Sequence, residues 1–198
     1  MGTSTYPALI QAVCEYLREK GFRRRSLGFN RLGPDGECFE GVTIQRTLRT
    51  YKERQFTIEV GVCIPKIEAL LNPELPQVKF PHAWYANLRE RLPLLAGWKD
   101  HWWPSEKTSE LTEISLLFER FGFPFLKRWN TMEKVFASYG QGLDRDKIRQ
   151  GLAACILHLS GKNNEARQGL LRIREGFHSR GIKSDYAERL AERMKITL

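Results

Sequence analysis

The sequence predicts an α+β fold: an N-terminal helix, an antiparallel sheet of about four to five strands, and an all-helical C-terminal part of about four to five helices. Apolar and polar residues alternate over residues 55–64, which is the period of a strand. The run Gly-Pro-Asp-Gly at residues 33–36 predicts a turn between two strand-forming segments. After residue 105, apolar residues recur every three to four positions, which is typical of helices.

The first helix is expected over residues 6–20. Pro7 suits the first turn of a helix, and Gly21 suits the position at which one ends. Residues 26–32 and 37–46 flank the predicted turn and should pair as a β-hairpin.

The strand over residues 55–64 should place one face in the core and the other face outside it. Cys63 belongs to the second face, where it either is exposed or faces helices. Residues 65–81 contain four prolines, so we expect mostly irregular chain with one helical turn. Alternation predicts a further strand over residues 84–89, and residues 100–104 suit a short edge strand.

The first C-terminal helix is expected over residues 110–121, with Ser109 as its N-cap and Gly122 at its end. Residues 151–178 also resemble one helical hairpin of the tetratricopeptide type, but one unit makes no solenoid. We therefore divide the chain into an α+β domain at 1–130 and a helical extension at 131–198 that packs on it. The remaining helices are predicted over residues 124–139 (one helix or two short ones), 144–160, 162–178 and 184–194.

The chain is basic, with 32 Lys and Arg against 23 Asp and Glu over 198 residues and a net charge of +9. Twenty of the bases are Arg, whose planar fork suits phosphate and carboxylate groups. A hydrophobic content of 41% is enough for a substantial core, so disorder is excluded. The charge permits contact with nucleic acid, an acidic protein surface or anionic lipid.

The N-terminal residues lack a secretory signal pattern, and no apolar run is long enough to cross a bilayer. The four cysteines are dispersed without a CxxC pair, which favours buried free thiols over disulfides. These observations predict a cytoplasmic protein with no membrane partner.

No motif for catalysis is recognisable. The four histidines lie far apart, without the spacing of a zinc site, and there is no GxSxG elbow or Walker loop. The sequence therefore predicts no catalytic residue, no cofactor and no metal.

The segment Arg23, Arg24 and Arg25 follows the first helix and could hold phosphates or an acidic partner. Arg46 could extend the same basic side if the hairpin folds back. In a purely structural interpretation, the three arginines neutralise helix-end carbonyls and form ion pairs with acidic residues. The candidate ion-pair partners are Glu37, Glu40 and Glu59.

A second candidate site is aromatic, because four of the five tryptophans lie between residues 84 and 103. Trp84 and Trp102, beside Arg89 and Arg91, could stack on bases or other rings. Packing within a small sheet explains these aromatic residues equally well.

Several motifs occur in a fixed order along the chain. They are Gly21-Phe22-Arg23-Arg24-Arg25, Val42-Thr43-Ile44-Gln45-Arg46, Phe56-Thr57-Ile58-Glu59-Val60-Gly61-Val62, the segment Trp84–Leu92, and Asp100-His101-Trp102-Trp103. Together they resemble the bacterial DUF4304 family over about residues 6–130. The resemblance implies an α+β fold and a bacterial, cytoplasmic setting. It carries no established activity and hence no catalytic residues.

We therefore expect a non-enzymatic interaction module that binds another protein, with an acidic surface as one option for that partner. An immunity-type inhibitor is one form of such a module. The alternative is a binder of nucleic acid or a phosphate ligand through Arg23–Arg25 and the region of Trp84 and Trp102. The second alternative is an enzyme of unrecognised type.

Overall fold

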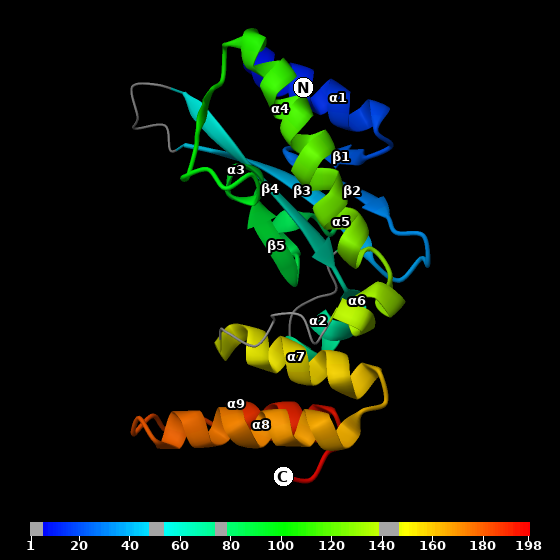
Figure 1. The fold of residues 1–198 in the computed structure, drawn as a ribbon, viewed down its shortest axis with the longest axis vertical. Coiled ribbons are helices and arrows are strands. Elements are labelled where there is room, and N and C mark those ends of the chain that lie inside the picture. The colour runs from blue at the N-terminus through cyan, green and yellow to red at the C-terminus, as the bar shows by residue number, and fades with distance from the viewer. Residues whose placement is uncertain (1–5, 48–53, 74–78, 139–146) are drawn as a thin grey trace. The chain divides into compact units, whose positions relative to one another are not determined.

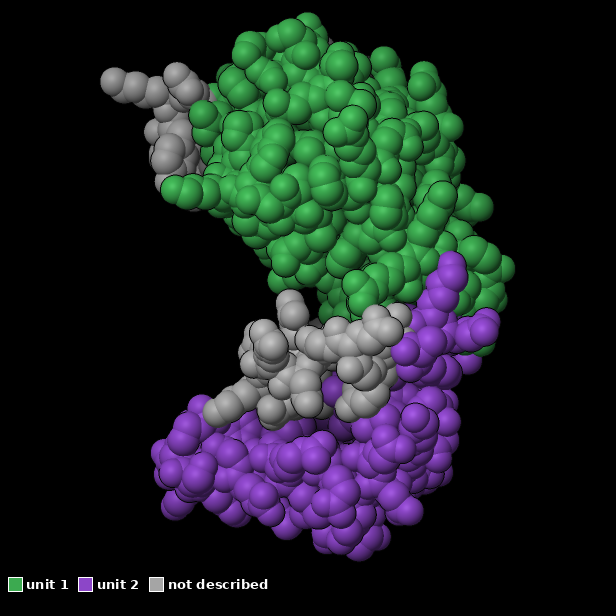
Figure 2. Space-filling view, viewed as in Figure 1, with its two compact units in different colours: residues 1–63, 78–131 green, residues 64–77, 132–198 purple. Residues whose placement is uncertain are grey.

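The computed structural model describes residues 6–47, 54–73, 79–138 and 147–198. Its chain forms two compact units (Figure 2). Unit 1 comprises residues 1–63 and 78–131, and unit 2 comprises residues 64–77 and 132–198.

Unit 1 is built around a sheet in which every strand pairing is antiparallel (Figure 1). The strand order is β1-β2-β3-β4-β5. The strand β6 pairs with the same edge of β4 as β5 does, but with the first two residues of β4, Gln55 and Phe56. The predicted hairpin is confirmed as β2 and β3, and the short strand near residue 104 is confirmed as β6. The strands are β1 (Arg23–Arg25), β2 (Gly28–Leu32), β3 (Phe39–Arg46), β4 (Gln55–Cys63), β5 (Leu88–Arg91) and β6 (Trp103–Pro104).

One face of the sheet carries the main core. The predicted first helix is confirmed as α1 (Ala8–Glu19), with Pro7 as its N-cap and Gly21 in a left-handed conformation just beyond its end. Side chains of α1 pack with those of α4 (Leu111–Leu117) and the turns after it, as in the contact of Tyr16 with Phe118. The fully buried residues of the sheet on this face are Phe29, Val42, Phe56, Ile58, Val60 and Val62.

The other face of the sheet is also buried, which corrects the prediction for residues 55–64. Thr57 and Cys63 point to this face and are buried, and the chain at residues 81–86 lies across it where the Cys63 thiol donates to the carbonyl of His82. Close approach explains the glycines here: a Cβ on Gly41 would lie 2.6 Å from the backbone nitrogen of Ala83. Alternation in a sequence shows which side of a strand is apolar, but not whether a later segment covers the polar side.

The strand predicted over residues 84–89 is wrong in its position. Residues 83–85 form the 3₁₀ turn η1 (Ala83–Tyr85), and β5 begins only at Leu88. The backbone N–H of Trp84 donates to Thr43 Oγ1 at 3.1 Å, which fixes this stretch on the sheet face instead of at its edge. The strand β1, which sequence reasoning missed, contains the three consecutive arginines.

The helix predicted over residues 110–121 has different ends. Ser109 lies inside the 3₁₀ turn η2 (Thr108–Glu110) and caps nothing. Gly122 does not end the helix, because the π-helical turn η3 (Phe118–Gly122) runs into α5 (Phe123–Trp129). The wider π turn accommodates Pro124, which has no N–H to donate. The short helix α3 (Leu92–Leu95) follows β5 directly.

Unit 2 is helical and contains α2 (Pro65–Leu71), which is separated in sequence from the other helices of the unit. Arg193 at the end of α9 donates to the carbonyl oxygens of Leu70 and Leu71, at 3.1 and 2.8 Å. The aromatic ring of Tyr186 lies against Gly151, where a Cβ would meet the hydroxyl. The other helices confirm the C-terminal prediction: α6 (Met132–Ser138), α7 (Lys147–Leu159), α8 (Asn163–His178) and α9 (Tyr186–Arg193).

The α+β fold class is thus confirmed, with an N-terminal helix, an antiparallel sheet and C-terminal helices. The division at residue 130 and the packing of the helices on the sheet stay predictions. The four cysteines are buried and form no disulfide with one another, as expected.

Candidate functional site

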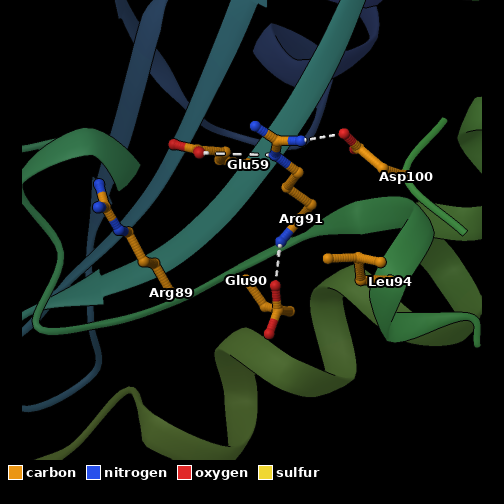
Figure 3. A pocket seen from close by; sticks show the side chains of 6 residues that line it. All are labelled: Glu59, Arg89, Glu90, Arg91, Leu94 and Asp100. Atoms are coloured by element: carbon orange, nitrogen blue, oxygen red, sulfur yellow. Dashed lines mark hydrogen bonds and ion pairs between the residues drawn. The ribbon is translucent and has the colours of Figure 1, made fainter. Parts of the chain in front are cut away.

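A pocket of about 270 Å³ lies in unit 1 beside β5 (Figure 3). The pairing of Glu59 with Arg91 and of Gly61 with Arg89 places both arginines on the sheet face that carries Glu59. The chain then turns through α3 and returns at Asp100. The residues that line the pocket are Glu59, Arg89, Glu90, Arg91, Leu94 and Asp100.

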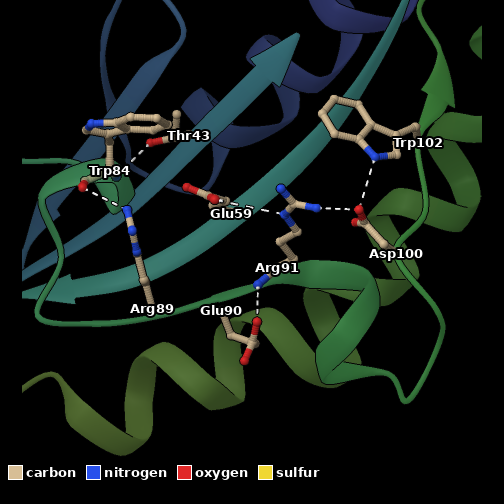
Figure 4. A network of polar contacts seen from close by, with 8 residues as sticks. All are labelled: Thr43, Glu59, Trp84, Arg89, Glu90, Arg91, Asp100 and Trp102. Atoms are coloured by element: carbon tan, nitrogen blue, oxygen red, sulfur yellow. Dashed lines mark hydrogen bonds and ion pairs between the residues drawn. The ribbon is translucent and has the colours of Figure 1, made fainter. Parts of the chain in front are cut away.

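Arg91 is the centre of the polar contacts in this pocket (Figure 4). Its guanidinium donates to Asp100 Oδ2 at 2.5 Å, and its Nε lies 4.0 Å from Glu59 Oε1. Trp102 Nε1 donates to the same Asp100 oxygen at 3.3 Å. The hydrogen bond from Arg91 holds the pKa of the Asp100 carboxyl below its usual value. Asp100 is therefore a charged anchor for Arg91 and is poorly suited to proton transfer at neutral pH.

Two arginine–tryptophan stacks flank Glu59. The Arg89 guanidinium donates to the carbonyl oxygen of Trp84 at 3.0 Å and lies 5.8 Å from the centre of its ring. The Arg91 guanidinium lies 5.5 Å from the centre of the Trp102 ring. In Figure 4 the Glu59 carboxylate lies between the two arginine side chains. Both stacks orient guanidinium groups against aromatic faces, as in cation–π interactions.

Exposed aromatic side chains gather in the segment that forms this site. Of the eight large apolar residues that are exposed in the described chain, four belong to residues 84–98. Trp84 is the most exposed of these four, at 53%. The others are Tyr85, Leu94 and Trp98. Exposed aromatic residues next to arginines are the composition typical of protein interfaces.

Three buried oxygen atoms on the covered face lack hydrogen-bond partners within the described residues: Gln45 Oε1, Thr57 Oγ1 and Glu59 Oε2. Gln45 pairs across strands with Thr57, and Glu59 follows Thr57 by two positions, so the three side chains share one face. Buried polar atoms normally have partners, so this row of acceptors is unusual.

The structure brings together three of the predicted site residues and separates the rest. Arg89 lines the pocket, Trp84 stacks on Arg89, and Trp102 donates to the lining residue Asp100. Arg23–Arg25 form β1 at the opposite edge of the sheet. Four strand spacings put β1 about 19 Å from β5. Arg46 lies at the end of β3 and is exposed.

The arginine side chains of β1 make contacts that do not involve the residues of the pocket. Arg24 stacks on Tyr6 and Phe29, with its Cζ 5.1 and 5.9 Å from the ring centres, and its Nε donates to the Ser26 carbonyl. Arg23 and Arg25 are exposed. No ion pair within the described chain involves these three arginines.

The ion pairs suggested for Glu40 and Glu59 in the structural interpretation are made by other bases. Arg31 binds Glu40 at 2.6 Å, and Arg91 is the base next to Glu59. Each base lies directly across from its acid on the neighbouring strand, which sequence distance does not reveal.

Sequence reasoning named Arg91 beside Arg89 and considered Glu59 only as an ion-pair partner of Arg23–Arg25, and it did not select Asp100 as a site residue; these three complete the site. Arg91 follows Arg89 by two positions, so a strand here would have placed both on one face. Nothing in the sequence indicated that Asp100 turns back to Arg91.

His82 anchors the segment that covers the sheet. Its Nδ1 lies 2.7 Å from Thr43 Oγ1, and its carbonyl accepts from the thiol of Cys63 at 3.2 Å. Burial lowers the pKa of His82 below its usual value. This histidine therefore positions Trp84, which follows two residues later.

Searches of the described residues for two other kinds of site found none. Among those residues, no three His, Cys, Asp or Glu side chains come close enough to hold a metal ion. Across the same parts of the chain, every helix is too short or too polar to cross a membrane.

In comparisons with known proteins, neither a curated protein nor a solved structure matched the chain. A family model does match, over residues 13–125, and its description is "Domain of unknown function (DUF4304)". The match covers more than half of the chain and includes β1 to β6 and the residues of the pocket. The chain therefore belongs to the DUF4304 family, as the motifs in its sequence suggested.

Proposed function

We propose that this protein is a non-enzymatic interaction module that binds a partner protein through the surface at Trp84, Arg89 and Trp102. The observation that carries the proposal is the exposed Trp84 ring, stacked by Arg89 at the rim of the pocket. Tryptophan, tyrosine and arginine are enriched among the residues that dominate binding energy at protein interfaces. The surface is also held rigidly, because Thr43 and His82 fix the segment that carries Trp84.

The charge of the pocket favours a protein partner over a nucleic acid here. The carboxylates of Glu59 and Asp100 balance its two arginines, although the whole chain has a net charge of +9. Arg91 is already engaged by Asp100, so it offers little uncompensated charge to a phosphate. Phosphate recognition depends on cationic groups that are free to replace counterions.

Site-specific photocrosslinking in the native host tests the proposal. A photoreactive phenylalanine analogue at Tyr85, which is 47% exposed, should give a discrete crosslinked partner protein. The same analogue at Leu116 of α4, which is 49% exposed, is the matched control and should give none. The Tyr85 adduct should be lost when Arg89→Ala is added. Equal adducts at both positions, or an adduct that survives Arg89→Ala, would contradict the proposal.

A second candidate function rests on Arg23 and Arg25, which are exposed at an edge of the sheet and carry no ion pair within the described chain. These two arginines could hold phosphate groups of a nucleic acid or another anion. Oligonucleotide binding should then weaken steeply as salt rises and should be reduced in Arg23→Ala/Arg25→Ala. The double variant Arg167→Ala/Arg172→Ala on α8 removes the same charge elsewhere and serves as the control. Binding that is equal in the two double variants would reject this function.

We place this function in the bacterial cytoplasm, and an immunity-type inhibitor is the form that we favour. Four buried cysteines without a disulfide among them suit a reducing compartment. A toxin gene next to the gene of this protein would support the immunity role, and coexpression with the product of that gene would test it directly.

A further inference from the structure

We infer that the pocket at Glu59 receives the guanidinium or ammonium group of a basic side chain on the partner protein. The inference rests on the proposed function and specifies the chemistry of the partner. It begins with the Glu59 carboxylate, whose Oε2 is buried and has no hydrogen-bond partner within the described chain. Its other oxygen has only the long contact of 4.0 Å to Arg91 Nε.

The arginine that could have satisfied Glu59 is held elsewhere. Arg91 makes its short contact, at 2.5 Å, with Asp100. Arg89 donates to the carbonyl of Trp84. Glu59 is therefore a partly buried carboxylate between two arginines that donate to other groups, and it retains the capacity to accept a donor from outside.

The surroundings of Glu59 select for a donor. Two further buried oxygen atoms on the same sheet face, Thr57 Oγ1 and Gln45 Oε1, also lack hydrogen-bond partners within the described chain, and both can accept a donor, although neither residue lines the pocket. Asp100 is a second carboxylate of the lining, and it is already paired with Arg91, which leaves Glu59 as the carboxylate that is open to a donor. A group rich in N–H donors and positively charged complements this set, whereas a carboxylate or phosphate would meet like charge.

The aromatic residues offer a place for such a group to stack. The protein's own arginines already stack on Trp84 and Trp102, at 5.8 and 5.5 Å from the ring centres. Trp84 remains 53% exposed, so much of its surface stays open to a second guanidinium. A guanidinium that stacks on an aromatic ring and donates its N–H groups to a carboxylate is bound strongly.

Selection from a displayed library of random peptides tests the inference with the full chain as bait. Parallel selections use Glu59→Gln, which keeps the shape and removes the charge, and Glu19→Gln, which removes the same charge from the exposed face of α1. Peptides enriched on the unchanged protein and on Glu19→Gln should share an arginine or lysine. They should bind Glu59→Gln at least about tenfold more weakly.

A second measurement leaves the protein unchanged, so it does not depend on the folding of a variant. Replacing the shared arginine of an enriched peptide by citrulline, its neutral isostere, should weaken binding at least about tenfold by fluorescence anisotropy. For a shared lysine, norleucine is the replacement. Equal binding of the neutral peptide, or of Glu59→Gln, would overturn the inference.

A third selection, on Trp84→Ala, distinguishes a failure of the inference about the basic group from a failure of the proposed function. Peptides that require Trp84 but neither Glu59 nor a basic residue would leave the proposed function standing and reject the inference. If the selection yields no peptide that requires Trp84, the proposed function and the inference both fail.

Discussion

Arg31 and Glu40 lie opposite each other on β2 and β3, and Arg31 Nε is 2.6 Å from Glu40 Oε2. The second oxygen of Glu40 accepts from the Asn130 amide at 2.6 Å, and Arg31 also donates to the carbonyl of Lys20 after α1. Glu40 is only 2% exposed. One buried carboxylate therefore joins the first helix, the hairpin and the residue that follows α5.

Replacing Glu40 by glutamine should destabilise the protein by about 2 to 3 kcal/mol, because it leaves the partly buried Arg31 without its counter-charge. Urea unfolding followed by tryptophan fluorescence measures the change. Glu119→Gln is the control, because Glu119 binds Lys20 at the same 2.6 Å but on the surface. Its unfolding midpoint should hardly move. Similar shifts for both variants would show that burial of the pair is not what matters.

Gly41→Ala should lower the free energy of unfolding by about 2 kcal/mol or more. The added methyl group would lie 2.6 Å from the Ala83 nitrogen, and the sheet and the covering segment would have to separate. Gly169→Ala in α8 should change the free energy of unfolding in the opposite direction, since its methyl group would lie at an ordinary 3.9 Å from the Cβ of Ala154. That change should stabilise the helix by about 0.5–1 kcal/mol. A Gly41→Ala protein as stable as the parent would mean that residues 81–86 do not lie on the sheet.

Acidification should destabilise unit 1 through His82. Because the folded state lowers the pKa of this histidine, the unfolded chain binds the proton more readily. Stability is therefore unaffected by this group above its ordinary pKa of about 6.5 and falls as pH drops below it. The melting temperature between pH 8 and pH 5 measures this, with His82→Asn as the comparison. The pH dependence should be shallower in His82→Asn, and an identical profile would exclude His82 as the cause.

The thiols should be unreactive in the folded protein. All four cysteines are buried, and burial raises the pKa of Cys155 to about 12 and also raises that of Cys14. Thiolates, which are the reactive form, are then scarce at pH 8. A colorimetric thiol reagent should modify no cysteine in buffer and four in denaturant. Rapid modification of the native protein would indicate that one of these sites opens readily.

The parts of the fold that sequence predicted are those set by local chemistry. Pro7 and Gly21 bound the first helix, and the Gly33–Gly36 turn orders the hairpin, because these residues restrict the backbone wherever they occur. The polar face of β4 could not be assigned from its own residues. Its burial depends on a segment twenty residues later, which Thr43 and His82 hold in place.

The candidate site was predictable only in part, for a similar reason. Trp84, Arg89 and Trp102 drew attention as residue types that bind partners, and they do lie together. Glu59 and Asp100 are ordinary acids in the sequence, and they acquire their roles only through the strand register and the turn after α3. Distances between side chains in different segments follow from tertiary structure, which a pattern along the chain does not encode.

The inclusion of α2 in the helical unit affects how this chain can be divided. Ile67 of α2 is fully buried, and the helix belongs to unit 2 although it lies between β4 and β5 in sequence. A fragment that ends at residue 130 would keep α2 and lose α7 and α9, so it would present an apolar helix to water. The matched family region, residues 13–125, includes α2 as well. A family member without such C-terminal helices would need polar substitutions on α2 or another chain to cover it, and the composition of this one helix should therefore reveal which relatives share the second unit.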